Sequence, residues 1–260
     1  MYMSLNDLTS AGISMLKSTL LPAAVTRRWF KPASHTSNLV NAVGAPWEIY
    51  SDTTAANGRI VDWYTKSGDV GAYASFVALS QDNEVGFGIL AAQDSGSPAV
   101  SVSVLADLIG DALLPALEAA AHTQASNAFV GTSSSSPQDL ITLASDDLPG
   151  LLIKNWTSNG ISELAVVANL LHKAKVELRL YPTNVVSSSP TGTTRAFRMI
   201  PASPPGDTGV FSLGCQSWGD IDYPIYGSQA ADKFDFSFGN DGAVESVTLR
   251  AYRQTLVKTS

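Results

Sequence analysis

The amino-acid sequence predicts two architectures in succession, an α/β (α+β) part followed by an antiparallel all-β sandwich or barrel domain. In the first part, stretches with apolar residues at helical spacing flank runs rich in Val, Ile, Phe and Tyr. After Gln124 the apolar residues recur at every second position, as they do in half-buried strands. We therefore place a boundary near residue 125, which gives domains at residues 1–124 and 125–260.

Two helices are expected at the beginning of the chain. Ser4 precedes an apolar pattern at helical spacing, and Asp7 three residues later completes a helix-capping pair. Pro22 suits the first turn of a second helix that extends to Phe30. The polar residues 33–45 that follow are expected to form a loop.

Strands and a long helix fill the rest of the first domain. The strands are expected at Pro46–Tyr50, Arg59–Thr65, Ala72–Ser80 and Glu84–Ala92. Short turns join the last three, which indicates an antiparallel meander. The helix is expected at Pro98–Thr123, where one broad face is apolar, with a kink at Pro115.

The second domain alternates between apolar and polar positions most clearly in two runs. Residues 176–180 alternate between apolar and charged side chains, and residues 234–238 alternate between Phe and polar side chains. Gly239 to Gly242 forms a hairpin-turn signal after the second run. Short strands separated by Gly, Ser and Pro are typical of a sandwich or barrel.

The composition excludes several classes of function. A net charge of −7 suits a phosphate backbone poorly, so we expect no nucleic-acid partner. The longest apolar run, Leu113–Ala121, is too short to cross a bilayer, so we expect no membrane role. His35, His122 and His172 are scattered without ligand spacing, so we expect no metal site and no cofactor.

Three features bear on the cellular compartment. The first residues lack the basic and apolar regions of a signal peptide, so the location stays open: cytoplasmic if the chain is translated as given, secreted if it belongs to a longer precursor. Asn155 begins an Asn-Trp-Thr sequon and is a glycosylation candidate in the secreted case. Cys215, the single cysteine, cannot form an internal disulfide and is expected to be a buried small apolar residue.

The motif Lys66-Ser67-Gly68-Asp69 is the strongest candidate for a binding site, at the junction of two strands of the meander. The Lys66 ammonium suits a carboxylate, and the Ser67 hydroxyl can donate to the same group. Gly68 would let a ligand approach the backbone closely. We therefore predict that these four residues line a small-molecule site, against the alternative of a solvated lysine at a strand end.

Two further matches to catalytic patterns have structural interpretations. Ser14 and Lys17 match Ser-x-x-Lys, but they lie in the first expected helix, where a surface serine and lysine are ordinary. Tyr73 and Ser75 match Tyr-x-Ser, but they lie on the strand that follows the binding motif. The catalytic residues are therefore unknown from the sequence.

The Lys-Ser-Gly motif in its strand context resembles the Lys-[Thr/Ser]-Gly strand of serine β-lactamases, penicillin-binding proteins and related esterases. Ser4 to Leu8 resembles the Ser-x-x-Asp-Leu helix of that group. Phe129–Thr132, Cys215–Trp218 and Asp232–Phe236 resemble the C-terminal β domain of its fungal members. The resemblance implies the C-terminal portion of a fungal β-lactamase-like protein, with the later half of a transpeptidase-like domain before the β domain.

This resemblance implies acyl-transfer chemistry through a covalent serine intermediate. It also implies that the motif Lys66-Ser67-Gly68-Asp69 forms the substrate-binding and oxyanion side of the site. In the family, the Ser-x-x-Lys and Tyr-x-Asn (or Tyr-x-Ser) motifs precede the Ser-x-x-Asp-Leu helix, with which this chain begins. We therefore expect a serine hydrolase or acyl-transferase homologue that lacks the nucleophile-bearing half and is not hydrolytic on its own. The alternative is a repurposed small-molecule binder, or a cyclase or isomerase in fungal metabolite biosynthesis.

The absence of the nucleophile-bearing half would also affect stability, because that half covers a face of the sheet and the wall of the cleft in the family. An exposed apolar face of several hundred Å² would cost on the order of 10 kcal/mol, which equals the total stability of a typical domain. Besides a small-molecule substrate or ligand, we therefore expect a repacked fold, a homo-oligomer, or a partner chain that covers the exposed sheet.

Overall fold

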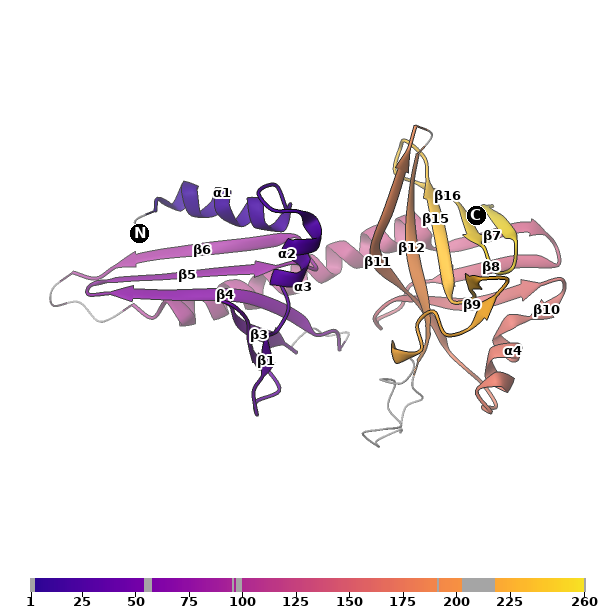
Figure 1. The fold of residues 1–260 in the computed structure, drawn as a ribbon, viewed down its shortest axis with the longest axis horizontal. Helices are drawn as coiled ribbons and strands as arrows, with labels where there is room; N and C mark the ends of the chain where they lie inside the picture. Colours follow the sequence, from indigo (N-terminus) through magenta and orange to yellow (C-terminus); the bar gives the residue numbers. More distant parts are fainter. Residues whose placement is uncertain are drawn as a thin grey trace. The chain divides into compact units, whose positions relative to one another are not determined.

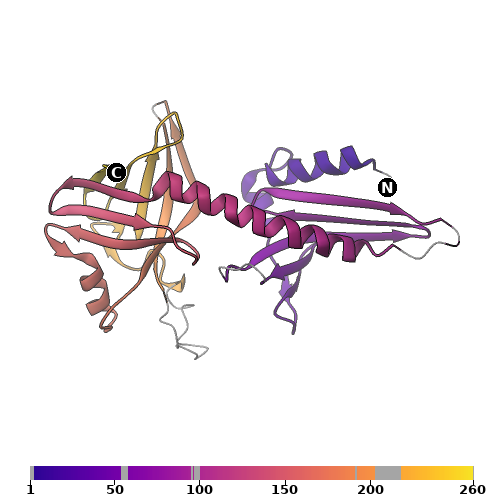
Figure 2. The same cartoon turned by 180° about the vertical axis from the view of Figure 1, so that it is seen from behind.

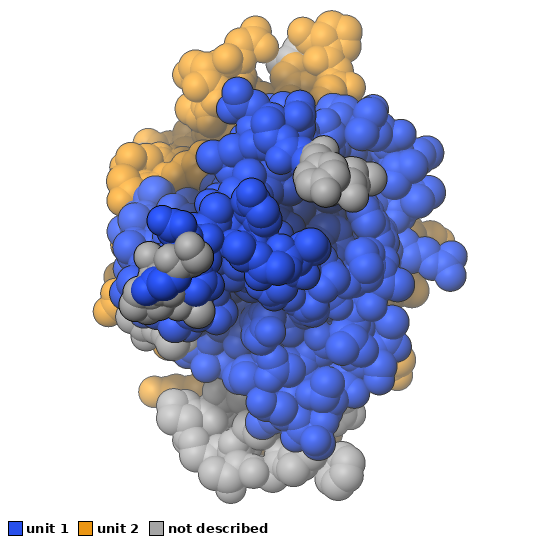
Figure 3. Space-filling view, turned by 90° about the vertical axis from the view of Figure 1, so that its left-hand side faces the viewer, with its two compact units in different colours: residues 1–120 blue, residues 121–260 orange. Residues whose placement is uncertain are grey.

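The computed structural model describes residues 3–53, 58–94, 96, 100–190, 192–202 and 218–259. The chain divides into two compact units, residues 1–120 and 121–260, which Figure 3 colours separately. The long helix α3 (Val102–Phe129) begins in the first unit and ends in the second. Cys215 and Pro98 lie outside the described residues.

The expectation that the first unit is an α/β (α+β) partial domain of the transpeptidase type is wrong. The chain is mostly sheet, with 43% of its residues in strands and 25% in helices. Every strand pairing of the first unit is antiparallel. Parallel strands need crossover connections of a dozen or more residues, usually a helix. In this unit the helices come before and after the strands instead of between them, so an antiparallel meander results.

The first unit is a six-stranded sheet whose strands follow one another in chain order (Figure 1). Its elements are α1 (Leu5–Leu16), α2 (Ala23–Trp29), β1 (Ser34–His35), β2 (Asn41–Val43), β3 (Glu48–Asp52), β4 (Val61–Val70), β5 (Tyr73–Ser80), β6 (Val85–Ala92) and the first part of α3. The segment expected to be a loop before β3 therefore contains two short strands.

Local sequence signals set several of these boundaries. Ser4 and Asp7 form the capping box of α1, in which Ser4 Oγ accepts the Asp7 N–H at 3.2 Å. Strand β4 continues through Lys66–Asp69 and turns at Gly71, whose φ of +60° favours a residue without a Cβ. The motif thus lies inside β4 and not at a turn. Helix α3 runs through Pro115 without ending.

An aromatic cluster holds β3 and β4 against the end of α2. The fully buried Phe30 stacks on Trp47 with ring centroids 5.1 Å apart and meets the Tyr64 ring edge-on at 5.0 Å. The Tyr64 hydroxyl donates to the Phe30 carbonyl at 2.9 Å, which satisfies the polar end of a buried ring. This packing positions the beginning of β3 beside the middle of β4, where the predicted motif begins.

The second unit is a closed antiparallel barrel of eight strands, one of the two architectures expected for it (Figures 1 and 2). Its strands are β7 (Gly131–Ser136), β8 (Asp139–Ala144), β9 (Leu151–Ser158), β11 (Leu178–Ser189), β12 (Gly192–Pro201), β15 (Lys233–Phe238), β16 (Val244–Leu249) and β17 (Gln254–Lys258). The pairing of β8 with β9 closes the barrel. Outside the ring lie β10 (Ile161–Ser162), α4 (Glu163–Leu170), and a hairpin of β13 (Ile225–Tyr226) and β14 (Gln229–Ala230).

Aromatic side chains fill the interior of the barrel. Phe234 and Phe236 of β15 are almost completely buried, as the period-two pattern of that strand predicts, and Trp156 of β9 is fully buried beside them. Phe129, at the end of α3, adds a fourth ring and lies 5.1 Å from Phe236, centroid to centroid. The barrel core therefore includes the last residue of the long helix.

Arg179 departs from the simple alternation, because it is buried although its neighbours on β11 face the core. Asp146 accepts two hydrogen bonds from the guanidinium group, at 2.8 and 2.6 Å, and Glu177 accepts a third from Nε at 2.6 Å. Such a bidentate carboxylate pair offsets the cost of removing the charge from water. The period-two pattern alone would place Arg179 in solvent.

Candidate functional site

The predicted motif lies along a half-covered stretch of β4. On one side, residues 66–70 pair with β5. On the other side, β3 pairs with β4 only between Val61 and Thr65, so no strand of the described chain covers the second side of the motif. An uncovered strand side offers backbone N–H and C=O groups to a ligand or to another strand. We call this side of residues 66–70 the β4 edge.

The carboxylate of Glu48, the first residue of β3, occupies the beginning of the β4 edge. Lys66 Nζ forms an ion pair with Glu48 Oε1. The Ser67 N–H donates to Oε2 at 3.2 Å, and Ser67 Oγ donates toward the same carboxylate, 3.1 Å from Oε2 and 3.3 Å from Oε1. Two successive residues therefore bind one carboxylate with an ammonium, a hydroxyl and a backbone N–H.

These donors control the ionisation of Glu48. Burial raises the pKa of the Glu48 carboxyl, but the hydrogen bonds from Lys66 and Ser67 and the Lys66 charge outweigh it, so the pKa lies below its ordinary value. Glu48 is therefore an ionised acceptor at neutral pH. Nearby, burial and the charges of Asp62 and Asp82 raise the pKa of Tyr64 to about 12, so its phenol stays protonated. Tyr64 is unsuited to act as a general base.

Gly68 and Asp69 complete the motif without touching Glu48. A Cβ on Gly68 would lie 2.8 Å from Ser75 Oγ, which donates to the Gly68 carbonyl at 3.1 Å. This close approach between β4 and β5 gives Gly68 a packing reason that is independent of any ligand. Asp69 is exposed near the end of β4.

The two other catalytic-pattern matches lie on separate elements. Ser14 is in the last turn of α1, and the exposed Lys17 is the residue that ends this helix, its N–H donating to the Ile13 carbonyl. Tyr73 begins β5 with 68% of its surface exposed, while Ser75 donates to the backbone of β4. In the part of the chain that the structure describes, the hydrogen bonds of Glu48 come from Lys66 and Ser67, and the hydroxyl of Ser75 donates to the Gly68 carbonyl. Neither match therefore contributes a side chain to the contact between Lys66 and Glu48.

Three further observations concern metal ligands, membrane spans and the sequon. Within the described ranges, no group of three His, Cys, Asp or Glu side chains is arranged to hold a metal ion. No helix in the same ranges has the length and apolar character needed to cross a bilayer. Asn155 is exposed on β9, whereas Trp156 beside it points into the barrel core.

Glu48 is the site residue that the sequence reasoning missed. It belongs to the short expected strand Pro46–Tyr50, in which a carboxylate is out of pattern among apolar residues. In the structure it pairs opposite Thr65, directly before Lys66. A charged residue inside an apolar strand was the available signal, but its partner depends on the register between β3 and β4.

Comparison with known proteins gives a family for the second unit. Residues 121–260 match the family model described as "Beta-lactamase-like-like, C-terminal domain". Over 292 aligned residues the chain is 25% identical to a "Beta-lactamase-like protein" from Arthroderma benhamiae (strain ATCC MYA-4681 / CBS 112371). The alignment covers 99% of this chain and 48% of the relative, as the C-terminal part of it, so the chain spans about half the relative's length. No solved structure matches the chain.

Proposed function

The chain belongs to the β-lactamase-like family through its C-terminal domain, and on this basis we propose that it is the substrate-binding part of a β-lactamase-related serine hydrolase or acyl-transferase. The β4 edge binds the carboxylate of a small-molecule substrate. The serine nucleophile comes from a segment outside this chain. By itself the chain hydrolyses neither β-lactams nor simple esters.

The observation that carries this proposal is the set of three donors that Lys66 and Ser67 direct at one carboxylate. Hydrogen bonds to an ionised carboxylate are about twice as strong as those between neutral groups. Glu48 has the same chemical group as a substrate carboxylate, so it occupies the position in which a substrate carboxylate would accept these hydrogen bonds. A substrate competes with Glu48 for them, and the 35% exposure of the Glu48 side chain leaves it free to turn into solvent.

Ser67 has the role of a donor to substrate, because the acceptor that its hydroxyl contacts in the described part of the chain is the Glu48 carboxylate. Its hydroxyl donates to Glu48, whose lowered pKa makes the carboxylate a weak base. Lys66 also donates to Glu48 and so is not a proton acceptor in this arrangement. Covalent catalysis needs a nucleophile beside an effective base, and the β4 edge provides a binding group instead.

The test is incubation of the 1–260 chain with a chromogenic cephalosporin, an activated ester and a fluorophosphonate, followed by mass spectrometry of the intact chain. We expect no turnover above buffer and no adduct. A stoichiometric adduct that disappears in Ser14→Ala or in Ser67→Ala would overturn the proposal and identify the serine that acts.

A second candidate, a binder or a cyclase or isomerase in fungal metabolite biosynthesis, is favoured by the same three donors, since it needs no nucleophile. The transcript upstream of residue 1 separates the two candidates. An in-frame Ser-x-x-Lys followed by Tyr-x-Asn supports the hydrolase, and a reading frame without them supports the binder.

A further inference from the structure

We propose that two copies of this chain associate through the outer side of β11, so that each copy adds a strand to the barrel sheet of the other. The outer side of residues 185–188 is the part of β11 that makes this contact, and we call it the β11 edge. The proposal is independent of the proposed function, because it concerns the barrel and requires no substrate.

Strand β11 is longer than the neighbour that covers its outer side. β9 pairs with β11 at Arg179 and Leu180, and within the described ranges it covers no later residue of β11. On the inner side β11 stays paired with β12 as far as Ser189. The two strands therefore continue together beyond the beginning of β9 to a hairpin, as Figure 1 shows. Along the β11 edge, β11 is an edge strand.

The β11 edge lacks the features that usually protect an edge strand. Natural proteins block such strands with charged side chains, prolines or bulges. In β11, Pro182 and the irregular register that follows it come before the edge. Residues 185–188 are Val-Val-Ser-Ser and carry no charge. Val185 and Val186 are 61% and 54% exposed, so solvent reaches this part of the strand.

The strands behind the β11 edge hold it in an extended conformation. Val186 pairs with Arg195 of β12, and Ser187 pairs with Thr194. These two residues of β12 pair in turn with β15, where Arg195 lies opposite Phe236. The edge is thus the outer strand of three, and three paired strands are enough for stable sheet structure. A strand that is already extended loses little conformational entropy when it pairs with another.

A second copy of the chain is the partner that suits this edge. The two valines and two serines offer no charge by which a peptide of different sequence would be selected. Antiparallel pairing about a two-fold axis brings the edge against itself, which is the self-complementary interface of a symmetric dimer. Cross-strand pairs of β-branched and hydroxyl side chains stabilise such a pairing. Because the contact is short, its area falls in the class of weak interfaces, and we expect a dissociation constant on the order of 100 µM.

Sedimentation equilibrium and hydrogen exchange test the proposal on the 1–260 chain. Between about 5 µM and about 500 µM we expect the average mass to rise from that of one chain toward that of two. Over the same range the amides of residues 185–188 should come to exchange roughly threefold more slowly, because most chains are then paired.

A double substitution with a matched control locates the contact. Val185→Lys/Ser187→Lys places like charges across the two-fold axis and should leave the chain monomeric at every concentration. Thr255→Lys/Val257→Lys adds the same charge at two exposed positions of β17, a strand with neighbours on both sides, and should leave the dimer intact. Circular dichroism checks that both variants fold.

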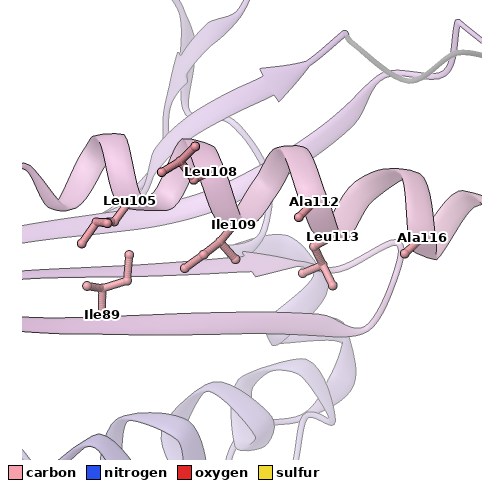
Figure 4. Close-up of a pocket in the computed structure, with 7 residues that line it drawn as sticks. All are labelled: Ile89, Leu105, Leu108, Ile109, Ala112, Leu113 and Ala116. Carbon is pink, nitrogen blue, oxygen red and sulfur yellow. The ribbon is translucent and has the colours of Figure 1, made fainter.

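Three results would overturn the proposal. One is a monomer across the whole concentration range, and another is a dimer that the β11 variant leaves intact or that the control variant also loses. The third is a dimer that Leu108→Asp abolishes, since Leu108 lies in a different exposed apolar groove, between α3 and β6 (Figure 4). None of these readouts depends on hydrolysis, so a failure here is distinct from a failure of the acylation test.

Discussion

Replacing Glu48 by Gln tests whether the β4 edge is organised around a carboxylate. The substitution keeps the size of the side chain and removes the charge that Lys66 Nζ and the Ser67 N–H both contact. The neighbouring aromatic cluster is left in place, because Glu48 is not part of it. We therefore expect a small loss of stability together with a gain in binding of external carboxylates.

The size of the loss follows from the exposure of the pair. The side chains of Glu48 and Lys66 are 35% and 45% exposed, so solvent screens their attraction. Exposed ion pairs contribute up to about 1 kcal/mol, and the hydrogen bonds from Ser67 place this pair near the upper end of that range. The expected loss in unfolding free energy is about 1 kcal/mol, or roughly fivefold in the folding equilibrium.

The loss should depend on pH in a defined direction. Because the pKa of Glu48 is lower in the folded chain than its ordinary value of 4.5, its contribution is complete above that value. It disappears as the pH falls through the folded pKa and Glu48 takes up a proton. Urea unfolding should therefore separate wild type from Glu48→Gln at about pH 7, and the difference should be smaller at about pH 3 because Glu48 is taking up a proton.

The control is Glu84→Gln, the same chemical change at an exposed residue in the β5–β6 turn. It should alter the unfolding free energy by less than Glu48→Gln does. If Glu48→Gln has no effect at about pH 7, or the same effect at both pH values, the three donors do not hold the carboxylate as described.

Two other predictions concern the barrel. Burial raises the pKa of Glu163, against a hydrogen bond from the Tyr252 hydroxyl at 3.2 Å, so its contribution is complete below the ordinary value and lost as the pH rises through the folded pKa. Glu163→Gln should therefore increase the unfolding free energy at about pH 7 and lose this advantage at about pH 4, whereas a decrease at about pH 7 would refute the reasoning. Asn155, exposed on β9, should acquire a glycan when the chain is secreted from yeast, seen as an endoglycosidase-sensitive mass that Asn155→Gln removes; an unmodified wild-type chain would contradict it.

Local signals predicted much of the first unit. The Ser4–Asp7 capping pair began a helix, and the short turns between apolar runs gave the meander of β4, β5 and β6. The resemblance to a fungal β-lactamase-like protein is confirmed by the family model and by the relative. The α/β class was wrong because it was inferred from helical spacing beside strand-like runs, while the short turns between those runs already indicated antiparallel pairing.

Other features depend on contacts between residues far apart in the sequence. Closure of the barrel requires β7, its first strand, to pair with β17, its last, as in the pairing of Ser134 with Val257, which no local pattern reveals. The burial of Arg179 depends on Asp146, more than thirty residues away. At the candidate site, Lys66 and Ser67 were predicted from their motif, but Glu48 required the register of β3 on β4.

Carboxylate binding at the β4 edge is the most direct test of the proposed function. Benzoate is titrated into the 1–260 chain while the amide resonance of Ser67 is followed by NMR. We predict saturable shifts at Ser67 that occur at lower benzoate concentrations in Glu48→Gln than in wild type, and that are lost in Lys66→Ala and weakened in Ser67→Ala. Shifts that persist in Lys66→Ala, or that are no larger at Ser67 than at exposed amides of the barrel, would contradict the account.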